Sequence, residues 1–297
     1  MKINFLKIRY VALILLSIFM FFSCSYGLDE FFYRDGVVNS RARSLLSLPS
    51  SEVPEVPSDA DYDFWLITDV HFGGEHGKKT GERKDQQFIQ KIMDLPQSKR
   101  PYFIVCLGDV AEHGKPGEYR NYRKFTDQIA EIPNPLGNPI VTYSIVGNHD
   151  LYNSGWESYR KYVYPYTSFY VFQTHGISWY FIDSGSGSLG KKQFSKLKAA
   201  MKNDSNKKFV FSHFPIYADG LFYFTMQDTT ERNLLISLCA KNDVIRFFDG
   251  HTHEKHENRL GGFIENNLPG YLEDRSWAVV TVNESSFSSR IKVVSLD

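Results

Sequence analysis

Five short polar clusters lie between positions 69 and 253, and each contains side chains that can bind a metal ion. Each cluster follows an apolar run, so we expect it where a buried strand ends and a loop begins. Side chains at the ends of several strands can meet in space although they are distant in sequence. In chain order the clusters are Asp69-Val70-His71, Gly108-Asp109, Gly147-Asn148-His149-Asp150, His213 and Gly250-His251-Thr252-His253.

The residue types in these clusters are those that hold transition metals. Asp69 and His71 are two residues apart, so on an extended strand end both side chains point the same way. The carboxylate of Asp109 has two oxygens and can bridge two ions. Mixed oxygen and nitrogen ligands suit zinc, manganese or iron, and not calcium. The sequence therefore predicts two such ions, held by Asp69, His71, Asp109, Asn148, His213, His251 and His253.

Each cluster taken alone also has an explanation that needs no metal. Asp-x-His and Gly-Asp are common sequences, and turns favour Gly, Asn and Asp because of their backbone preferences. A lone histidine such as His213 is more often a hydrogen-bonded core residue than a ligand. The Gly250–His253 cluster is the most specific of the five. All five in this order, each behind an apolar run, favour a metal site over unrelated turns.

Alternating strand and helix patterns would position the first three clusters. Apolar runs at 64–68, 102–107 and 140–146 predict strands that are buried on both faces. Apolar residues at helical spacing over 85–95 and 119–129 predict helices between those strands. This order of elements is typical of βαβ units in a parallel sheet.

The second half of the chain adds antiparallel strands. Its pattern predicts, in chain order, a hairpin around 174–176, a helix over 189–201, a strand at 208–212, a helix over 232–241, a strand at 244–248 and tail strands at 277–282 and 290–294. Together these elements predict one α/β domain with βαβ units in its first part and antiparallel strands in its second.

The clusters together resemble the calcineurin-like metallophosphoesterase superfamily, whose sequence blocks run D-x-H, G-D, G-N-H-[DE], H and G-H-x-H. The resemblance extends over about 63–294 and includes every block. It implies two mixed β-sheets packed as a sandwich with helices on the outer faces, in four layers, and a site at the carboxyl ends of the strands. By position, one ion would take Asp69, His71, Asp109 and His253, and the other Asp109, Asn148, His213 and His251.

The same resemblance implies roles for three further residues. His149 matches the family histidine that contacts the phosphate and can protonate the leaving group. Glu112 occupies a position where some relatives carry an acid that orients this histidine, and Asp150 is a second candidate for that role. The implied reaction is hydrolysis of a phosphomonoester or phosphodiester by a hydroxide that bridges the two ions, with His149 as general acid.

Two residues narrow the resemblance. Purple acid phosphatases carry tyrosine three residues after the bridging aspartate and lack the histidine of D-x-H, whereas Glu112 and His71 occupy those positions here. The pattern is closer to class III cyclic-nucleotide phosphodiesterases and generic bacterial phosphoesterases. The alternative from another class is a non-catalytic surface lipoprotein that uses the fold to bind a partner. The complete ligand set and His149 favour the enzyme.

The N-terminus is expected to be a signal peptide over residues 1–23. Its basic start leads into an apolar run at 10–22 that is short for a membrane span, which needs about 20 residues. A small residue followed by Cys24 resembles a bacterial lipobox, which would place a lipid-anchored protein on the periplasmic or cell-surface side of the envelope. The alternatives are an uncleaved anchor or ordinary cleavage with Cys24 incidental. Residues 24–60 are expected to be a tether, and 61–297 the phosphoesterase domain. The apolar residues Phe31, Phe32, Tyr33, Leu45 and Leu46 give the alternative that part of the tether docks on the domain.

Composition limits the partners of this chain. Its 297 residues are 42% hydrophobic and 23% charged, which suits one large globular domain or two small ones. A formal net charge of zero gives no reason to expect nucleic acid. The resemblance implies a small phosphate ester as substrate, and no obligate protein partner is evident in the sequence. Cys106 and Cys239 lie in apolar runs and are expected to be small core residues, although a disulfide between them is an alternative.

Two loops near the clusters are candidates for substrate selection. Residues 72–83 carry a histidine, lysines and Arg83 just after two predicted ligands, and could add positive charge for a phosphate. Residues 217–224 follow His213 and are rich in aromatic residues, which could stack on a base or sugar. The alternatives without a role in substrate binding are that the first loop is simply solvated and that the second packs against the domain.

Overall fold

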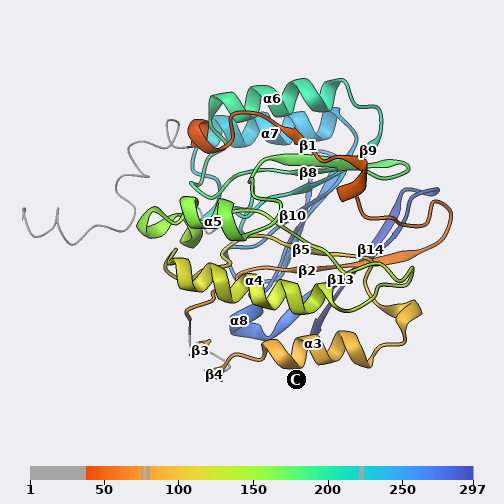
Figure 1. Cartoon of the computed structure of the whole chain (residues 1–297). Coiled ribbons are helices and arrows are strands. Elements are labelled where there is room, and N and C mark those ends of the chain that lie inside the picture. Colours follow the sequence, from red (N-terminus) through yellow and green to blue (C-terminus); the bar gives the residue numbers. More distant parts are fainter. Residues whose placement is uncertain (1–37, 75, 78–80, 221–223, 297) are drawn as a thin grey trace, which may run out of the picture.

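The computed structural model describes residues 38–74, 76–77, 81–220 and 224–296. The predicted signal peptide, Cys24 and the first part of the predicted tether lie outside the described residues. Within them, strands form a layered core with helices on either side (Figure 1). None of the described helices has the length and apolar character needed to cross a bilayer.

The smaller of the two large sheets has five strands in the order β14-β13-β2-β5-β6. β2 (Tyr62–Ile67), β5 (Ile104–Cys106) and β6 (Thr142–Ser144) run parallel to one another, as expected from their apolar composition. β13 (Ser276–Asn283) and β14 (Ser288–Ser295) close the other side as antiparallel strands. The tail strands predicted from the sequence therefore complete this sheet.

The larger sheet has seven strands. In sheet order they are β1 (Leu46–Ser47), β7 (Tyr170–Gln173), β8 (Ile177–Phe181), β9 (Lys207–Phe211), β10 (Val244–Asp249), β12 (Phe263–Asn267) and β11 (His256–Leu260). β7 and β8 form the predicted antiparallel hairpin, whereas β8, β9, β10 and β12 are parallel neighbours. The sequence did not predict the β11–β12 pair, because β11 is an edge strand with mostly polar residues.

Aromatic side chains fill the space between the two sheets. Phe64 of β2 stacks on Phe103 with ring centroids 5.2 Å apart, and its edge meets Trp179 of β8 at 5.0 Å. Phe211 of β9 stacks on Phe181 at 4.6 Å. All five rings are fully buried, and each large ring contributes roughly 1.5–3 kcal/mol by leaving water. This layer fixes the two sheets face to face.

Helices cover both outer faces of the sandwich. α3 (Asp85–Asp94) and α4 (Pro116–Ala130) pack on the five-stranded sheet, and α6 (Gly190–Lys202) and α7 (Thr229–Lys241) on the seven-stranded sheet (Figure 1). The predicted four-layer α/β fold is confirmed. Smaller elements are η1 (Ser50–Glu52), β3 (His76–Gly77), β4 (Gly81–Glu82), η2 (Gln97–Lys99), η3 (His149–Ser154), α5 (Trp156–Tyr162) and α8 (Tyr271–Asp274).

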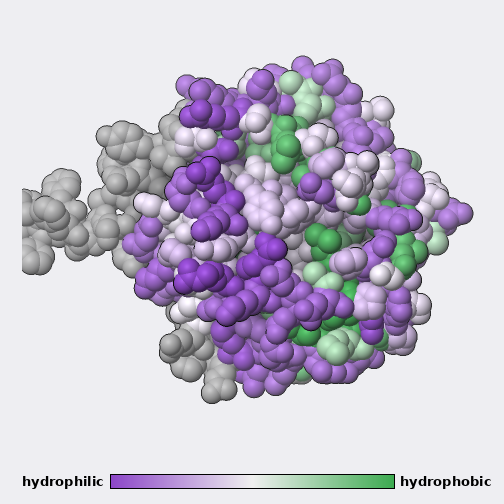
Figure 2. All heavy atoms as spheres, in the orientation of Figure 1, coloured by the Kyte–Doolittle hydropathy of each residue, from purple (hydrophilic) through white to green (hydrophobic). Residues whose placement is uncertain are grey.

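Outward-facing sides of these helices meet water. Most atoms on the face drawn in Figure 2 are hydrophilic, with apolar atoms gathered in patches over its middle and lower right.

Cys106 and Cys239 are both buried and free, so the described cysteines are core residues as expected.

Residues 38–60 pack on the domain, although the sequence analysis assigned them to a tether. β1 pairs in parallel with β7 and forms one edge of the larger sheet. Val38 and Ala42 are completely buried, and Leu48 and Val56 are nearly so. The serines and prolines of this segment suggested a flexible linker, but its few apolar side chains suffice to dock it.

Arg41 anchors this segment through a buried ion pair. Its guanidinium donates to both carboxylate oxygens of Asp183, at 3.0 and 3.1 Å, and to the Ser186 hydroxyl at 2.9 Å. Ser168 donates to the same carboxylate at 2.6 Å. The side chains of Arg41 and Asp183 are 2% and 0% exposed, so water cannot replace either partner. Planar, bidentate pairing of this kind is specific to arginine.

Replacement of Arg41 with alanine is expected to lower the free energy of unfolding by about 3–5 kcal/mol, because it leaves the Asp183 carboxylate buried without a counter-charge. Urea denaturation followed by tryptophan fluorescence measures this change. The matched control is Arg43→Ala, since Arg43 is exposed two residues further along the chain. Equal stability of the two variants would contradict the anchoring role of Arg41.

Candidate metal centre

The five predicted clusters converge at one end of the sandwich. Asp69 and His71 follow β2, Asp109 follows β5, and Asn148 follows β6, and these three parallel strands end at the same edge of the five-stranded sheet. His213 follows β9 and the pair His251 and His253 follows β10, which are parallel neighbours in the facing sheet. The carboxyl ends of both sheets therefore supply the site, as in other open α/β sheets.

Left-handed backbone conformations turn these side chains inward. Five of the seven predicted ligands have positive φ: Asp69 (56°), His71 (47°), Asp109 (50°), His251 (69°) and His253 (57°). This conformation costs a non-glycine residue roughly 1–2 kcal/mol. Such strain is concentrated at functional sites, where the surrounding structure enforces it. Gly108, with φ of 98°, is required here, since a Cβ would lie 2.8 Å from His213 Nδ1.

The ligand atoms form overlapping groups in which every atom lies within 4.8 Å of the others. One group contains Asp69, His71 and His253, and another contains Asp109, His213 and His251. A third joins His71, Asp109 and His149. Asn148 belongs with the second group, because its Oδ1 lies 3.0 Å from His213 Nε2. Asp109 thus lies between two groups, which is where a bridging carboxylate would have to be.

Buried polar atoms in the first group fit a cation. Asp69 Oδ1 and His71 Nε2 are buried and make no regular hydrogen bond. His253 Nε2 approaches Asp69 Oδ1 to 3.1 Å, but His71 Nε2 is 3.8 Å from that oxygen and 3.9 Å from Asp109 Oδ2. Buried polar groups nearly always have a partner. A divalent ion between these atoms would satisfy them, and the oxygen–nitrogen donor set suits zinc, manganese or iron.

Burial and mutual attraction set the charges of these groups. Burial alone would raise the pKa of Asp69, but His253, and to a lesser extent His213 and His71, hold it well below its usual range. Burial would lower the pKa of His213, but Asp109 raises it to about 9. In the same way Asp69 raises the pKa of His253 to about 10. A metal ion binding these nitrogens must therefore displace protons.

His251 differs from the other two histidines. Its pKa is lowered to about 3 by burial and then by His213, so the ring is neutral and its nitrogen can bind a cation directly. The ring lies over Phe214 with centroids 3.9 Å apart, and its backbone N–H donates to Asp69 Oδ2 at 3.1 Å. These contacts fix the ring plane before any ion binds.

His149 stands beside both groups. Its backbone N–H donates to Asp109 Oδ1 at 2.8 Å, and its ring is 4.7 Å from that of His71. Nδ1 lies 2.8 Å from the carbonyl oxygen of Glu112. Because a carbonyl oxygen only accepts, Nδ1 carries a hydrogen, and Nε2 is the nitrogen that can exchange a proton with a substrate.

The backbone of Glu112, and not its carboxylate, contacts His149. The carboxylate lies 2.8 Å from His71 Nδ1, in an ion pair too oblique for a regular hydrogen bond. Glu112 therefore touches both histidines through different groups, and the expectation that its carboxylate orients His149 does not match this geometry. The reason is local: the residue's carbonyl already lies beside the His149 ring, so its side chain extends toward His71.

Asp150 holds the loop that carries His149. Its two carboxylate oxygens accept from the backbone N–H groups of Ala111 and Gly147, each at 2.9 Å, and its carbonyl accepts from Tyr119. Burial, and then the charge of Asp109, raise the pKa of Asp150 to about 7. These contacts give Asp150 a place in the loop scaffold, and they involve backbone rather than the His149 ring.

Glutamine in place of Glu112 is expected to weaken metal binding by about 10–100-fold, the usual effect of removing the partner of a metal-bound histidine. Turnover at saturating metal should change little, since Glu112 reaches His149 only through its backbone. Titration of the metal-free protein with Mn²⁺, followed by activity at each concentration, separates the two effects. A large loss of turnover at saturating Mn²⁺ with unchanged metal affinity would contradict this role.

The structure adds residues that the sequence analysis missed. Glu273 of α8 lies 3.3 Å from His253 Nδ1, and Thr68 donates to Asp69 Oδ2 at 2.6 Å. His213 Nδ1 donates to the carbonyl oxygen of Leu107 at 2.8 Å, which leaves Nε2 toward the site. Thr68 could have been found as the neighbour of a predicted ligand. Glu273 had no sequence signal, because it reaches the site from a different part of the chain.

A cavity of about 470 Å³ opens onto the ligands. The described residues that line it are Asp109, Asn148, His149, Phe224, His251, Thr252, His253, Glu254 and Glu273. Histidines apart, the ionisable ones among them are all acidic. Phe224, half-exposed at the mouth, is the part of the predicted aromatic loop that the structure places here, with its ring 5.7 Å from that of His251.

The guanidinium of Arg83 makes its hydrogen bonds within the protein. The guanidinium donates to both oxygens of Asp85 and, at 2.8 Å each, to the backbone carbonyls of Val70 and His71. It also lies over the Phe72 ring at 4.0 Å. Arg83 therefore supports the loop that carries two predicted ligands. Its charge is engaged within the protein and does not match the expectation that it faces a phosphate. The lysines of this loop lie outside the described residues.

The chain belongs to the calcineurin-like phosphoesterase family, whose sequence model matches residues 62–255. Among solved structures it resembles GAP50, the anchor in the inner membrane complex of Plasmodium, at 15% identity and a TM-score of 0.57 over 80% of this chain and 85% of that one. A putative 5′-nucleotidase from Staphylococcus aureus is 12% identical, with a TM-score of 0.52 over 80% of this chain and 54% of that one.

At these identities the structural likeness shows the fold alone. A comparison with curated proteins finds no match for this chain. The family nevertheless confirms the resemblance found in the sequence, and the grouped His and Asp side chains support divalent-metal binding.

Proposed function

We propose that this protein hydrolyses a small phosphomonoester or phosphodiester with the help of two divalent ions. The observation that carries the proposal is the position of Asp109, whose carboxylate belongs to two groups of potential ligands and also accepts from the backbone of His149. The Asp109 carboxylate would thus bind both ions and also hold the backbone of the proton donor, His149. Two ions bound there would neutralise phosphate charge and acidify a water molecule so that it becomes a nucleophile near neutral pH.

The protein's own residues would perform three tasks. Asp69, His71 and His253 would hold one ion, and Asn148, His213 and His251 the other, with Asp109 shared. The carbonyl of Glu112 fixes the His149 ring so that Nε2 faces away from that contact. His149 in its imidazolium form would give the proton on Nε2 to the departing oxygen as the bond to phosphorus breaks.

The acidic lining of the cavity makes the reaction depend strictly on metal. Its lining includes Glu254, Glu273 and the ligand carboxylate of Asp109. Bound cations would offset these negative charges and attract a phosphate group. The test is hydrolysis of p-nitrophenyl phosphate and of bis-p-nitrophenyl phosphate by protein stripped with a chelator and then reloaded with Mn²⁺ or Zn²⁺. No activity toward either ester in any reloaded form would overturn the proposal.

A second candidate is a non-catalytic protein that uses this fold to bind a partner. The specific observation in its favour is the structural likeness to GAP50, which is described as an anchor. The complete set of grouped ligands favours the enzyme. A metal-loaded protein inert toward both esters, but retained on a partner from the same cell envelope, would favour the anchor.

Metal binding is expected to raise the melting temperature. A ligand that binds only the folded state stabilises it by about 2.7 kcal/mol at a concentration 100 times its dissociation constant. Differential scanning fluorimetry with and without chelator measures the shift. An unchanged melting temperature over a Mn²⁺ titration would contradict a metal site in the folded protein.

We also propose that the enzyme acts outside the cytoplasm, anchored through an acylated Cys24. The support is the sequence alone, a basic start and an apolar run followed by this cysteine. Cys24→Ser should abolish labelling of the protein by a palmitate analogue and release it from the membrane fraction or block its processing. Membrane association and labelling that persist in Cys24→Ser would contradict the anchor.

A further inference from the structure

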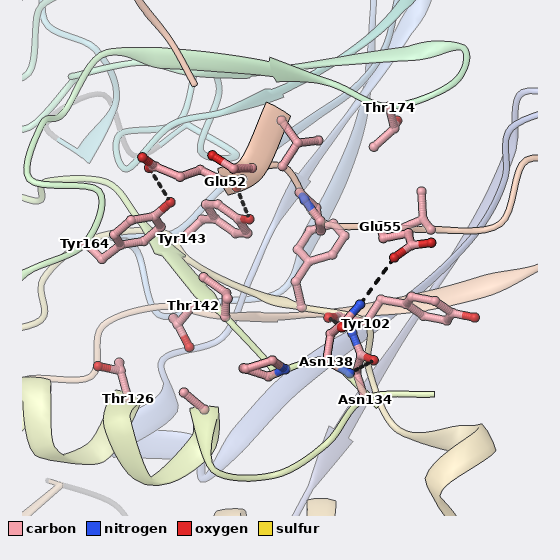
Figure 3. Close-up of a pocket in the computed structure, with 18 of the residues that line it drawn as sticks. Glu52, Glu55, Tyr102, Thr126, Asn134, Asn138, Thr142, Tyr143, Tyr164 and Thr174 are labelled. Carbon is pink, nitrogen blue, oxygen red and sulfur yellow. Dashed lines mark hydrogen bonds between the residues drawn. The ribbon is translucent and has the colours of Figure 1, made fainter. Parts of the chain in front are cut away.

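A second, larger cavity lies at the opposite end of the strands from the metal centre. Its volume is about 960 Å³ (Figure 3). Tyr102 and Phe103 line it just before β5, and Val141 and Thr142 at the start of β6, whereas the predicted metal ligands follow the carboxyl ends of the same strands. The segment around η1 and the helix α4 form its side walls. Every lining residue is within the described part of the chain.

The lining of this cavity is acidic. It contains three carboxylates, from Glu52, Glu55 and Asp127, and one guanidinium, from Arg123. Arg123 donates to Asp127 at 2.6 Å and to the Tyr166 hydroxyl at 2.8 Å, so its charge is already matched. Among the described lining residues no other Lys or Arg balances Glu52 and Glu55. The cavity therefore disfavours an anion.

Two tyrosine hydroxyls donate to Glu52, one to its carboxylate and one to its backbone carbonyl. Tyr164 donates to Glu52 Oε2 at 2.8 Å, and Tyr143 donates to the Glu52 carbonyl at 2.7 Å (Figure 3). The Tyr143 and Tyr164 ring centroids are 5.7 Å apart with planes at 56°, and Tyr164 and Tyr166 are 5.7 Å apart at 88°. Tyr143 is buried, whereas Tyr164 and Tyr166 are partly or largely exposed. An accessible tyrosine ring beside a carboxylate can bind an ammonium group.

Thr142 supplies a polar group that lacks a partner. Its side chain is 5% exposed, and its hydroxyl makes no hydrogen bond within the protein. Figure 3 shows it between β6 and Thr126 of α4, against the cavity. A buried hydroxyl without a partner costs free energy, so its presence points to a hydrogen-bonding partner from outside the protein. A protonated amine has N–H groups to give, whereas a quaternary ammonium has none.

We propose that this cavity binds a protonated alkylamine. The ammonium group would lie against the rings of Tyr164 and Tyr166. Glu52 and Glu55 would balance its charge, and one N–H would be directed toward the Thr142 hydroxyl. The apolar part of the ligand would contact Val53, Pro54 and Val141, which line the same space. This site is separate from the metal centre, so the inference does not depend on the proposed phosphoesterase activity.

The test is calorimetric titration of the full, metal-loaded protein with putrescine. We expect one site per chain, and we expect Glu52→Gln to weaken binding by about tenfold or more, the usual effect of losing a charged hydrogen-bonding partner. Thr142→Val keeps the shape of the side chain and should also weaken binding. The matched control is Glu157→Gln, because Glu157 is exposed on α5 and pairs with Arg160 outside the cavity.

Three results would overturn the proposal. One is the absence of putrescine binding at millimolar concentration. Another is equal binding by Glu52→Gln and the unaltered protein, or an equal loss in Glu157→Gln, which would mean general attraction to an acidic surface. The third is binding of glucose or of inorganic phosphate in place of putrescine, which would assign the cavity to a neutral or anionic ligand. Phosphate-ester hydrolysis by Glu52→Gln should be unchanged.

Discussion

Asp109→Asn is expected to abolish phosphate-ester hydrolysis and to remove most of the bound metal. Losing a single hydrogen-bond donor from a catalytic site already costs about 10²–10³ in turnover, so the loss of a shared metal ligand should exceed about 10³-fold. The amide keeps one oxygen to accept from the His149 backbone N–H, so the loop should retain its shape. The variant loses the negative charge of Asp109, whose Oδ2 lies 3.9 Å from His71 Nε2 and 3.4 Å from His213 Nε2.

Metal content by inductively coupled plasma mass spectrometry and kcat/KM for p-nitrophenyl phosphate measure the two effects. Asp94→Asn is the matched control, because Asp94 is exposed on α3 and only accepts from Gln90. Circular dichroism of both variants shows whether the fold is preserved. A folded Asp109→Asn protein with two equivalents of metal and normal turnover would eliminate the bridging role and, with it, the proposed mechanism.

The sequence predicted the positions of the site residues because each lies at the end of a buried strand. Apolar runs before Asp69, Asp109 and Asn148 mark strands of a parallel sheet, and parallel strands end at a common edge. The order of the clusters then matched a known family. Motif spacing thus carried most of the information about which residues meet.

What the sequence could not show depends on contacts between distant segments. Glu273 reaches His253 from a four-residue helix, and no local pattern links the two. Arg41 finds Asp183 across 142 positions, so a segment with the composition of a linker becomes the edge of a sheet. The left-handed backbone of the predicted ligands is also invisible in the sequence. Asp and His adopt it more often than most residues but still only in a minority of cases, so the fold decides where it occurs.

The side-chain direction of Glu112 illustrates the same limit. Its position in the family pattern suggested a partner for His149, and the residue does lie beside that ring. Only the structure separates its carbonyl, which accepts from His149, from its carboxylate, which faces His71. A sequence motif specifies which residues are neighbours but not which of their groups touch.

His149→Ala is expected to lower turnover by about 10²–10⁴-fold, the usual contribution of a general acid, and to leave the metal content unchanged. The size of the loss should depend on the leaving group. An alkyl phosphate releases an alkoxide, which needs a proton, so its hydrolysis should suffer the full loss. A p-nitrophenyl ester releases a stable anion and should be affected much less. A merely structural role for His149 would slow both substrates equally.

One feature of the site makes this comparison decisive. His149 lies within 4.8 Å of ligand atoms of His71 and Asp109, so it could bind an ion instead of donating a proton. In that case His149→Ala would lose metal, and added Mn²⁺ would restore turnover toward both esters. His175→Ala is the control, since that histidine lines the far cavity and donates to the Val56 carbonyl there. Full metal content combined with normal hydrolysis of the alkyl ester would remove His149 from the mechanism, because no proton donor would then be missing.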